Sequence, residues 1–358
     1  MSWVITFVGF AALIMLHEFG HFAAAKAVGM RVERFMLFFP PIVWKVRRGE
    51  TEYGIGAIPL GGYVKITGMT PREELPEEIA YRAYHLQPVW KRVVVILAGP
   101  VMNIIIAFAL IWGIYVFNGE YQSTNSVASI TKGTAAAAVL KPGDRLLAVD
   151  GTRGDTAALR AAIGKHGCAG GAKTDGCQGS PAQVTVERNG RELTFTARPR
   201  YNAQADRPLL GFAFDVKKHY PGAVTGVGDA ATGMWDLTKA TVSTFGKLFY
   251  SEKARKEVSS VVGGFERTRQ AVNSDFVTGL MTLAIISLSL AIINLFPFLP
   301  LDGGHVFWAV AEKIRGRPIP FTVMERASVV GFMLVIAIFL IGLTNDINTL
   351  RGKGFGIR

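Results

Sequence analysis

His17-Glu18-Phe19-Gly20-His21 lies inside a stretch, residues 3–25, that is otherwise as apolar as a membrane-spanning helix. Its two histidines and its glutamate are the only ionisable side chains of that stretch. Such groups cost at least about 2.5 kcal/mol each at the centre of a bilayer, so they indicate a functional site. On a helix, residues four apart share a face, which allows both histidines to bind one zinc ion while Glu18 reaches the zinc-bound water. The pentapeptide therefore predicts a hydrolytic metal centre inside a membrane.

The composition of the whole chain agrees with a membrane setting. Half of the 358 residues are hydrophobic and the mean hydropathy is +0.30. The apolar residues gather in four nearly uncharged runs, each close to the ~20 residues that cross a bilayer: 3–25, 93–117, 276–301 and 327–344. Buried helices of a soluble protein are the alternative, but four such runs in one chain argue against it. The first run lacks a basic leader and a small-residue cleavage site, so we expect it to remain in the mature chain.

The sequence thus predicts a polytopic α-helical membrane protein with four transmembrane helices, a membrane-associated β-hairpin and one inserted extracytoplasmic α+β domain. The expected segments are transmembrane helix 1 (1–30), a cytoplasm-facing re-entrant hairpin and loop (31–92), transmembrane helix 2 (93–117), the inserted domain (122–216), a linker with an amphipathic helix (217–275), transmembrane helix 3 (276–305) and transmembrane helix 4 (321–345).

Basic residues predict the orientation in the membrane. They are frequent between the first two runs, and the connection between the last two runs carries Lys313, Arg315, Arg317 and Arg326. The positive-inside rule places both loops in the cytoplasm, and both termini and the inserted domain outside. We expect the bacterial cytoplasmic membrane. Because loops beside anionic lipid account for the net charge of +12, no nucleic-acid partner is needed.

Residues 53–66 combine β-branched and aromatic residues with turn glycines, which is typical of a hairpin. A hairpin that dips into the membrane is tolerated only where it packs on protein or lines a wet cavity. A hairpin on the cytoplasmic surface is an equal alternative. An exposed strand edge here can pair with an extended peptide, so the candidate substrate-positioning residues of this segment are Gly54, Gly56, Gly61 and Gly62.

The inserted domain shows alternating strand patterns at residues 127–130, 183–187 and 192–197, with a hairpin turn at Asn189-Gly190. Residues 141–151, KPGDRLLAVDG, read as turn, strand and turn, and resemble the signature of bacterial PDZ domains. These domains bind a peptide as an added strand.

The two cysteines, Cys168 and Cys177, lie close together in this segment, which is expected outside the cell. Their spacing and that location favour a local disulfide over a metal site. The amphipathic helix at 229–258 is expected at the membrane interface or against this domain.

A zinc hydrolase needs a third protein ligand and an open position for water. Asp302 is the strong candidate, because it follows the uncharged run 276–301 in the segment NLFPFLPLDGGH, residues 294–305. The two prolines break the helix and the two glycines allow a sharp turn. His17 lies about 21 Å into the first run, and the third run crosses in the same direction, so both groups fall toward the cytoplasmic leaflet. His305 is a rival ligand, for which we expect a supporting role.

The second run contains Gly99 and Asn103. We expect close helix packing at Gly99, and support of the metal site by Asn103.

Together, HEFGH, the PDZ-like signature and NxxPxxxLDGGH resemble the site-2 protease family of intramembrane zinc metalloproteases, closest to the bacterial branch that cleaves anti-sigma factors. The resemblance covers essentially the whole chain. It implies one Zn²⁺ held by His17, His21 and Asp302, Glu18 as catalytic base, and Asn294 as a group that holds the substrate backbone. It also implies a single-pass membrane substrate, either an anti-sigma factor or a remnant signal peptide.

Two features depart from that family's pattern. The chain has room for one PDZ-like domain where better-known relatives have two, and Val262-Gly263-Gly264-Phe265 stands where many show a GPxGI-like motif.

Two other functions compete with proteolysis. A transporter predicts inverted repeats or paired broken helices, but the sequence has one broken helix and no repeat. A membrane scaffold that recruits partners through the PDZ-like domain leaves the His-Glu-His cluster without a purpose.

Overall fold

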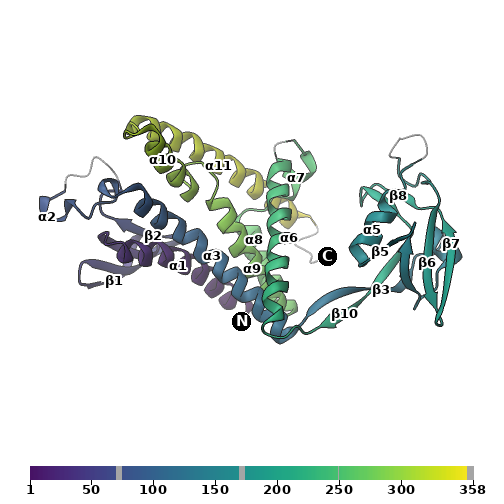
Figure 1. Cartoon of the computed structure of the whole chain (residues 1–358). Helices are drawn as coiled ribbons and strands as arrows, with labels where there is room; N and C mark the ends of the chain where they lie inside the picture. The colour runs from purple at the N-terminus through teal and green to yellow at the C-terminus, as the bar shows by residue number, and fades with distance from the viewer. Residues whose placement is uncertain (70–74, 169–173, 249, 353–358) are drawn as a thin grey trace. The chain divides into compact units, whose positions relative to one another are not determined.

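The computed structural model describes residues 1–69, 75–168, 174–248 and 250–352 of the chain. It divides into two compact units, one formed by Met1–Asn118 with Gly222–Arg358 and the other by Gly119–Pro221. Figure 1 labels most of the helices and strands of both units. Each unit is described by itself.

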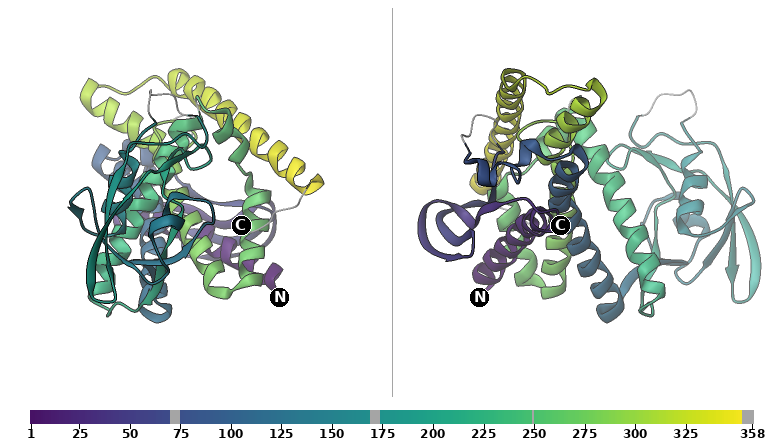
Figure 2. Two further views of the ribbon diagram at one scale, coloured as in Figure 1. Left: turned by 90° about the vertical axis from the view of Figure 1, so that its right-hand side faces the viewer. Right: turned by 60° about the vertical axis from the view of Figure 1, so that its left-hand side comes forward.

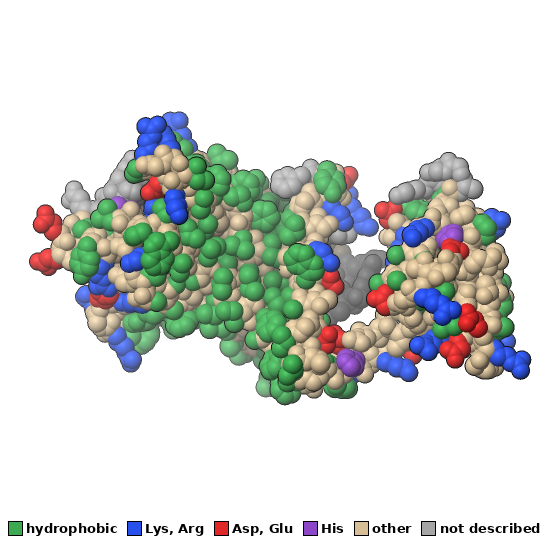
Figure 3. Space-filling view, viewed as in Figure 1, with side chains coloured by type: hydrophobic (Ala, Val, Ile, Leu, Met, Phe, Trp, Pro, Cys, Tyr) green, Lys and Arg blue, Asp and Glu red, His purple; other side chains and the backbone are tan. Residues whose placement is uncertain are grey.

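Four described helices of the first unit are long and apolar enough to cross a membrane. They are α1 (Ser2–Ala27), α3 (Val89–Asn118), α9 (Phe276–Asn294) and α11 (Phe321–Arg351). Exposed apolar side chains such as Val330 and Met333 cover α11, and hydrophobic side chains cover much of this unit in Figure 3. An apolar exterior of this kind is what a lipid environment requires.

The predicted third transmembrane segment, 276–305, is divided in the structure. The helix α9 ends at Asn294, and Asp302 is the first residue of a separate helix, α10 (Asp302–Arg315). An irregular loop with Pro297 and Pro300 joins them, since proline cannot continue the hydrogen-bond ladder of a helix. The candidate ligand therefore stands on its own short helix.

The helix α3 packs against α1, α9 and α10, and Figures 1 and 2 show it alongside α1 and α9. Small residues allow the close approach. A Cβ on Gly20 of α1 would lie 2.3 Å from the carbonyl oxygen of Ala98 in α3. On the other side of α3, the Ser287 hydroxyl of α9 donates a hydrogen bond of 2.9 Å to the Asn103 carbonyl oxygen. The helices α1, α9 and α10 thus pack around α3 in one bundle.

The structure folds residues 32–66 into a β-hairpin of β1 (Val32–Arg48) and β2 (Thr51–Ile66). Both strands bend, so that residues 32–37 pair with residues 62–66 on one side and with residues 52–55 on the other. Among the described strands, residues 62–66 have no second partner and form an open edge. The short helices α2 (Glu77–Ala80) and η1 (Tyr84–Leu86) come after the hairpin.

The predicted amphipathic helix at 229–258 is two helices, because α6 (Thr225–Leu248) ends before α7 (Glu252–Glu257) begins. Ala230 of α6 is buried with Ile111 of α3 and Ala284 of α9, so α6 packs on the helical bundle.

The helix α8 (Val261–Ser274) begins at the segment that departs from the family's motif. The buried carboxylate of Asp346 in α11 accepts hydrogen bonds from the backbone N–H groups of Ser260 and Gly263, at 2.8 and 3.0 Å. A Cβ on Gly263 would lie 2.2 Å from that carboxylate. This glycine therefore fits the docking of α8 onto α11.

The second unit is an α+β module around one sheet with the strand order β10-β3-β4-β6-β7. Its elements are β3 (Glu120–Ile130), α4 (Ala135–Val139), β4 (Arg145–Val149), β5 (Thr152–Arg153), α5 (Thr156–Gly164), β6 (Ala182–Arg188), β7 (Arg191–Ala197), β8 (Arg200–Asn202), β9 (Arg207–Leu209) and β10 (Phe212–His219). Leu146, Leu159 and Val184 are fully buried in its core.

The turns of this unit agree with the sequence pattern. Asn189 and Gly190 take positive φ values of 53° and 72° between β6 and β7, as a two-residue hairpin turn requires. Cys168 and Cys177 are joined in a disulfide with their Cα atoms 5.8 Å apart.

Candidate metal centre

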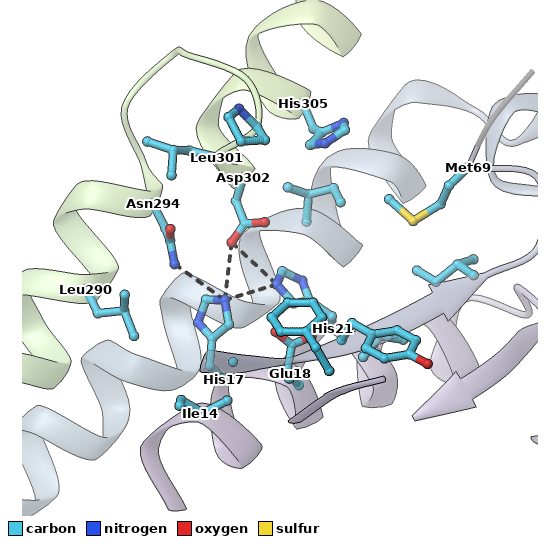
Figure 4. Close-up of a pocket in the computed structure, with 18 residues that line it drawn as sticks. Ile14, His17, Glu18, His21, Met69, Leu290, Asn294, Leu301, Asp302 and His305 are labelled. Atoms are coloured by element: carbon cyan, nitrogen blue, oxygen red, sulfur yellow. Dashed lines mark hydrogen bonds and ion pairs between the residues drawn. The ribbon is translucent and has the colours of Figure 1, made fainter. Parts of the chain in front are cut away.

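Three side chains from two helices meet in the bundle of the first unit. His17 and His21 lie one turn apart on α1, and their Nε2 atoms are 3.3 Å apart. The Oδ2 atom of Asp302, at the start of α10, lies 3.4 Å from each of these nitrogens. Figure 4 shows the three groups pointing toward one another. Among the described residues, they form the one cluster of histidine, cysteine and carboxylate side chains with ligand spacing for a metal ion.

The spacing of the three atoms fits zinc. Ligands at ~2.0–2.1 Å from a tetrahedral ion stand about 3.3 Å from one another, and the three separations here are 3.3, 3.4 and 3.4 Å. The Asp302 Oδ2 atom is buried and has no hydrogen-bond donor. A buried carboxylate oxygen without a donor is costly unless a cation satisfies it. The triangle of donor atoms thus suits a metal ion with a fourth position left for water.

The helix α3 holds the far side of each imidazole. The Nδ1 atom of His21 lies 2.9 Å from the Val95 carbonyl oxygen, which can only accept, so Nδ1 carries the proton and Nε2 offers its lone pair. The fully buried Asn103 amide lies 3.0 Å from the Nδ1 atom of His17. The amide nitrogen is the atom placed there, while the amide oxygen is buried without a partner. A flip that exchanges the two atoms turns the oxygen to Nδ1, where it accepts a hydrogen bond from the imidazole N–H. Both histidines are thereby oriented with Nε2 toward the cluster.

Gly99 of α3 lies directly behind the imidazoles. A Cβ at this position would stand 2.2 Å from the His21 Nε2 atom and 2.9 Å from the His17 Cε1 atom. The close packing expected at Gly99 is thus against the metal-binding face of α1 itself.

A cavity of about 390 Å³ opens beside the three groups, and Glu18 lines it. Val64 on the open strand edge lines the same cavity, and its backbone N–H faces the Glu18 carboxylate. Gly61 and Gly62 also line the cavity, and a Cβ on Gly62 would lie 3.0 Å from Glu18 Cγ. The hairpin edge and the candidate base therefore face the same space.

Gly54 and Gly56 lie elsewhere in the hairpin. A Cβ on Gly54 would come within 2.4 Å of the Trp44 carbonyl oxygen, and a Cβ on Gly56 within 2.1 Å of the Phe39 carbonyl oxygen. Because neither glycine lines the cavity, the contribution that the structure shows for them is the close packing of β1 on β2.

Asn294 and His305 complete the polar lining of the cavity. The Asn294 amide nitrogen lies 3.5 Å from the His17 Nε2 atom, as Figure 4 shows. His305 stands on α10 one turn beyond Asp302 and outside the ligand cluster. The imidazoles of His85 and His166 bond elsewhere, to the Gly68 carbonyl oxygen and to Asp150 respectively.

Comparison with known proteins decides the family. The model of peptidase family M50 matches residues 5–338. This chain belongs to peptidase family M50, the site-2 protease family. It is similar to the zinc metalloprotease Rip1 of Mycobacterium tuberculosis, with 32% identity over 98% of this chain and 99% of that protein. It is also similar to the metalloprotease MmpA of Caulobacter vibrioides, with 28% identity over 94% of this chain and 93% of that protein.

This M50 protein is accordingly a membrane zinc metalloprotease with zinc as its cofactor. Sequence reasoning missed several of the groups around the ligand cluster in this M50 protein. The Val95 carbonyl and the Val64 N–H belong to the backbone, which carries no residue-specific signal. The hydroxyl of Ser287 is part of an apolar run and looks like any small helix residue.

Proposed function

We propose that this protease hydrolyses a peptide bond within the transmembrane segment of a single-pass membrane protein. The observation that carries the proposal is the ligand triangle of His17, His21 and Asp302, with its buried carboxylate oxygen, in a bundle of helices that can span a bilayer. These three residues are the proposed zinc ligands. Bound zinc lowers the pKa of a coordinated water and polarises the substrate carbonyl.

Glu18 is the proposed catalytic base. It comes directly after the first ligand in the chain and lines the same cavity. In that place it can accept a proton from the attacking water and later return it to the leaving amine.

A helical substrate hides its carbonyl groups in internal hydrogen bonds, so it must unwind before cleavage. The open edge at residues 62–66 faces the cavity and supports the addition of an unwound segment as a strand. Gly61 and Gly62 leave room for that segment, and Asn294 across the cavity is the proposed contact to its backbone. Gly54 and Gly56 act indirectly, by keeping the hairpin folded.

We further propose that the protein lies in the bacterial cytoplasmic membrane, with both termini and the second unit outside. The basic connection between α9 and α11, with Lys313, Arg315 and Arg317, supports this orientation. The second unit is the proposed PDZ-like domain, which screens substrates already shortened outside. An anti-sigma factor is the proposed substrate, and a remnant signal peptide is the alternative.

Reconstitution in liposomes with a single-pass substrate tests the proposal. We expect Glu18→Gln to bind one zinc ion per chain like the wild type while cleavage falls by at least about 100-fold, because the metal ligands are intact and the base is missing. The substitution Glu52→Gln, on the hairpin outside the cavity, is the matched control and should cleave normally. Full cleavage by Glu18→Gln, or a wild-type protein that binds no zinc, would contradict the proposal.

A further inference from the structure

We propose that the ion pair between Arg92 of α3 and Glu312 of α10 is a positioning device that holds Asp302 at its place in the ligand triangle. The inference rests on the proposed function, in which Asp302 is a zinc ligand. It assigns a role in metal binding to two charged residues that lie outside the metal-site cavity and belong to neither the HEFGH nor the LDGGH motif.

The ion pair between Arg92 and Glu312 is bidentate. The Nη1 atom of Arg92 donates to Glu312 Oε2 at 3.0 Å, and Nη2 donates to Oε1 at 2.7 Å. Two parallel bonds between a planar guanidinium and a carboxylate fix orientation as well as distance. The Arg92 residue is only 8% exposed, so water competes little for these bonds. The pair therefore ties one point of α10 to one point of α3.

Glu312 acts on Asp302 through the helix that carries both. The two residues are ten positions apart, about 15 Å along the axis. Val306, between them, packs against the buried cluster that contains Val95 and Ile96 of α3. A rigid helix held at Glu312 cannot turn or slide without moving its first residue, and that residue is Asp302.

The opposite end of α10 is held in a different way. A Cβ on Gly303 would lie 2.3 Å from the Leu295 carbonyl oxygen, and one on Gly304 would lie 2.4 Å from the Leu299 backbone nitrogen. These contacts press the start of α10 against the preceding loop, and that loop has no regular secondary structure over residues 295–301. These contacts hold only the start of α10, and the bidentate ion pair at Glu312 fixes the direction of the helix axis at a second point ten residues further on.

The same helix, α3, positions the other two ligands. Beyond Arg92 it supplies the Val95 carbonyl to His21 and the Asn103 amide to His17. One helix thus serves as the common frame for all three ligands. The ion pair between Arg92 and Glu312 holds α10, and with it the Asp302 carboxylate, in a fixed position relative to α3.

The test measures metal affinity rather than cleavage. Zinc dissociation constants come from competition with a chromogenic chelator, and the absorption bands of bound Co²⁺ report the coordination geometry. We expect Glu312→Gln to weaken zinc binding about tenfold and to change the Co²⁺ bands. The control Lys313→Gln removes a charge from the next residue, which is exposed, and should leave both unchanged.

Two further variants separate positioning from folding. Arg92→Lys keeps the positive charge but loses the two parallel N–H donors of the guanidinium group. It should weaken zinc binding less than Glu312→Gln does. The double variant Arg92→Glu with Glu312→Arg re-creates the pair and should recover most of the affinity. Wild-type affinity in Glu312→Gln, or no recovery in a double variant that unfolds as cooperatively as the wild type, would overturn the inference.

Asp302→Ala distinguishes failure of the inference from failure of the proposed function. If Asp302→Ala binds zinc as tightly as the wild type, Asp302 is not a ligand, and both proposals fall. If Asp302→Ala binds zinc more weakly while Glu312→Gln keeps the wild-type affinity, only the role of the ion pair is wrong.

Discussion

His17 and His21 lie one turn apart on a continuous helix of 26 residues, whereas Asp302 opens a separate helix of 14 residues after an irregular loop. The spacing along α1 sets the relation between the two imidazoles, and α3 needs only to orient them. Tertiary contacts alone set the place of the carboxylate. We call His17 and His21 the histidine half of the site and Asp302 the carboxylate half. Zinc binding by the histidine half should be sensitive to changes at its contact with α3. Zinc binding by the carboxylate half should be sensitive to changes far along α10.

The largest effect is expected where α3 touches the histidine half. Gly99→Ala would put a Cβ 2.2 Å from the His21 Nε2 atom, so the imidazoles must move away from the ligand position. We expect zinc affinity to fall by about 100-fold or more, measured by chelator competition. Gly113→Ala on the same helix is the control, because its Cβ would meet nothing within 4 Å. Equal affinities in the two variants would show that α3 does not determine the histidine geometry.

A smaller loss is expected when one imidazole loses its outer partner. Asn103→Leu removes the side-chain amide beside the His17 Nδ1 atom, and we expect zinc affinity to fall ~10–100-fold. Asn103→Asp offers an oxygen acceptor at the same place and should retain more of the affinity than Asn103→Leu. If both variants lose zinc equally, the amide acts by packing rather than by orienting His17.

The carboxylate half can be disturbed at the start of α10. Gly303→Ala would place a Cβ 2.3 Å from the Leu295 carbonyl oxygen and so displace Asp302. We expect about a tenfold loss of zinc affinity, because the two histidines still bind the metal. Gly264→Ala in α8, where a Cβ meets nothing within 4 Å, is the control. A loss as large as that of Gly99→Ala would mean that the two halves are not independently built.

The smallest effect is expected outside both halves, at the turn of the hairpin. Hydrogen bonds from Arg82 lower the pKa of Glu50 to about 2. A carboxylate with a lowered folded-state pKa stabilises the fold above about pH 4.5, and this contribution is lost as the pH falls toward 2. Glu50→Gln should lower stability at pH 7 by about 1 kcal/mol or less, with zinc affinity unchanged.

Thermal unfolding between pH 7 and about pH 2 checks this prediction. The wild type and Glu50→Gln should differ at neutral pH and converge on acidification. A difference that stays constant with pH would show that the charge of Glu50 is not involved.

The contrast between the local spacing of the two histidines and the tertiary placement of Asp302 also explains how much of the site the sequence could predict. The four apolar runs predicted the membrane helices, because length and hydropathy are properties of one segment. The spacing of His17 and His21 predicted a shared face, since helical periodicity is local. Asp302 could be selected as a candidate, but the separate helix α10 was not predicted, because the two prolines indicate where a helix breaks and carry no information on the structure of residues 302–315.

The remaining contacts depend on segments far apart in the chain. Glu312 and Arg92 are 220 residues apart, and each looks like an ordinary charged residue near the end of a helix. The bend that lets residues 32–37 pair on both sides comes with close contacts of Gly54 and Gly56 to the backbone of β1, which strand propensity does not describe. The amphipathic pattern at 229–258 was right in kind but missed the break at the end of α6.

The identity of the third ligand is the central claim, and X-ray absorption at the zinc edge tests it most directly. The wild type should show two imidazole nitrogens and two oxygens, from Asp302 and water, at ~2.0–2.1 Å. In Asp302→Ala the imidazole contribution should stay at two while one oxygen is lost or replaced by water. A third imidazole in the wild type, which His305 on the same helix would supply, would contradict the account.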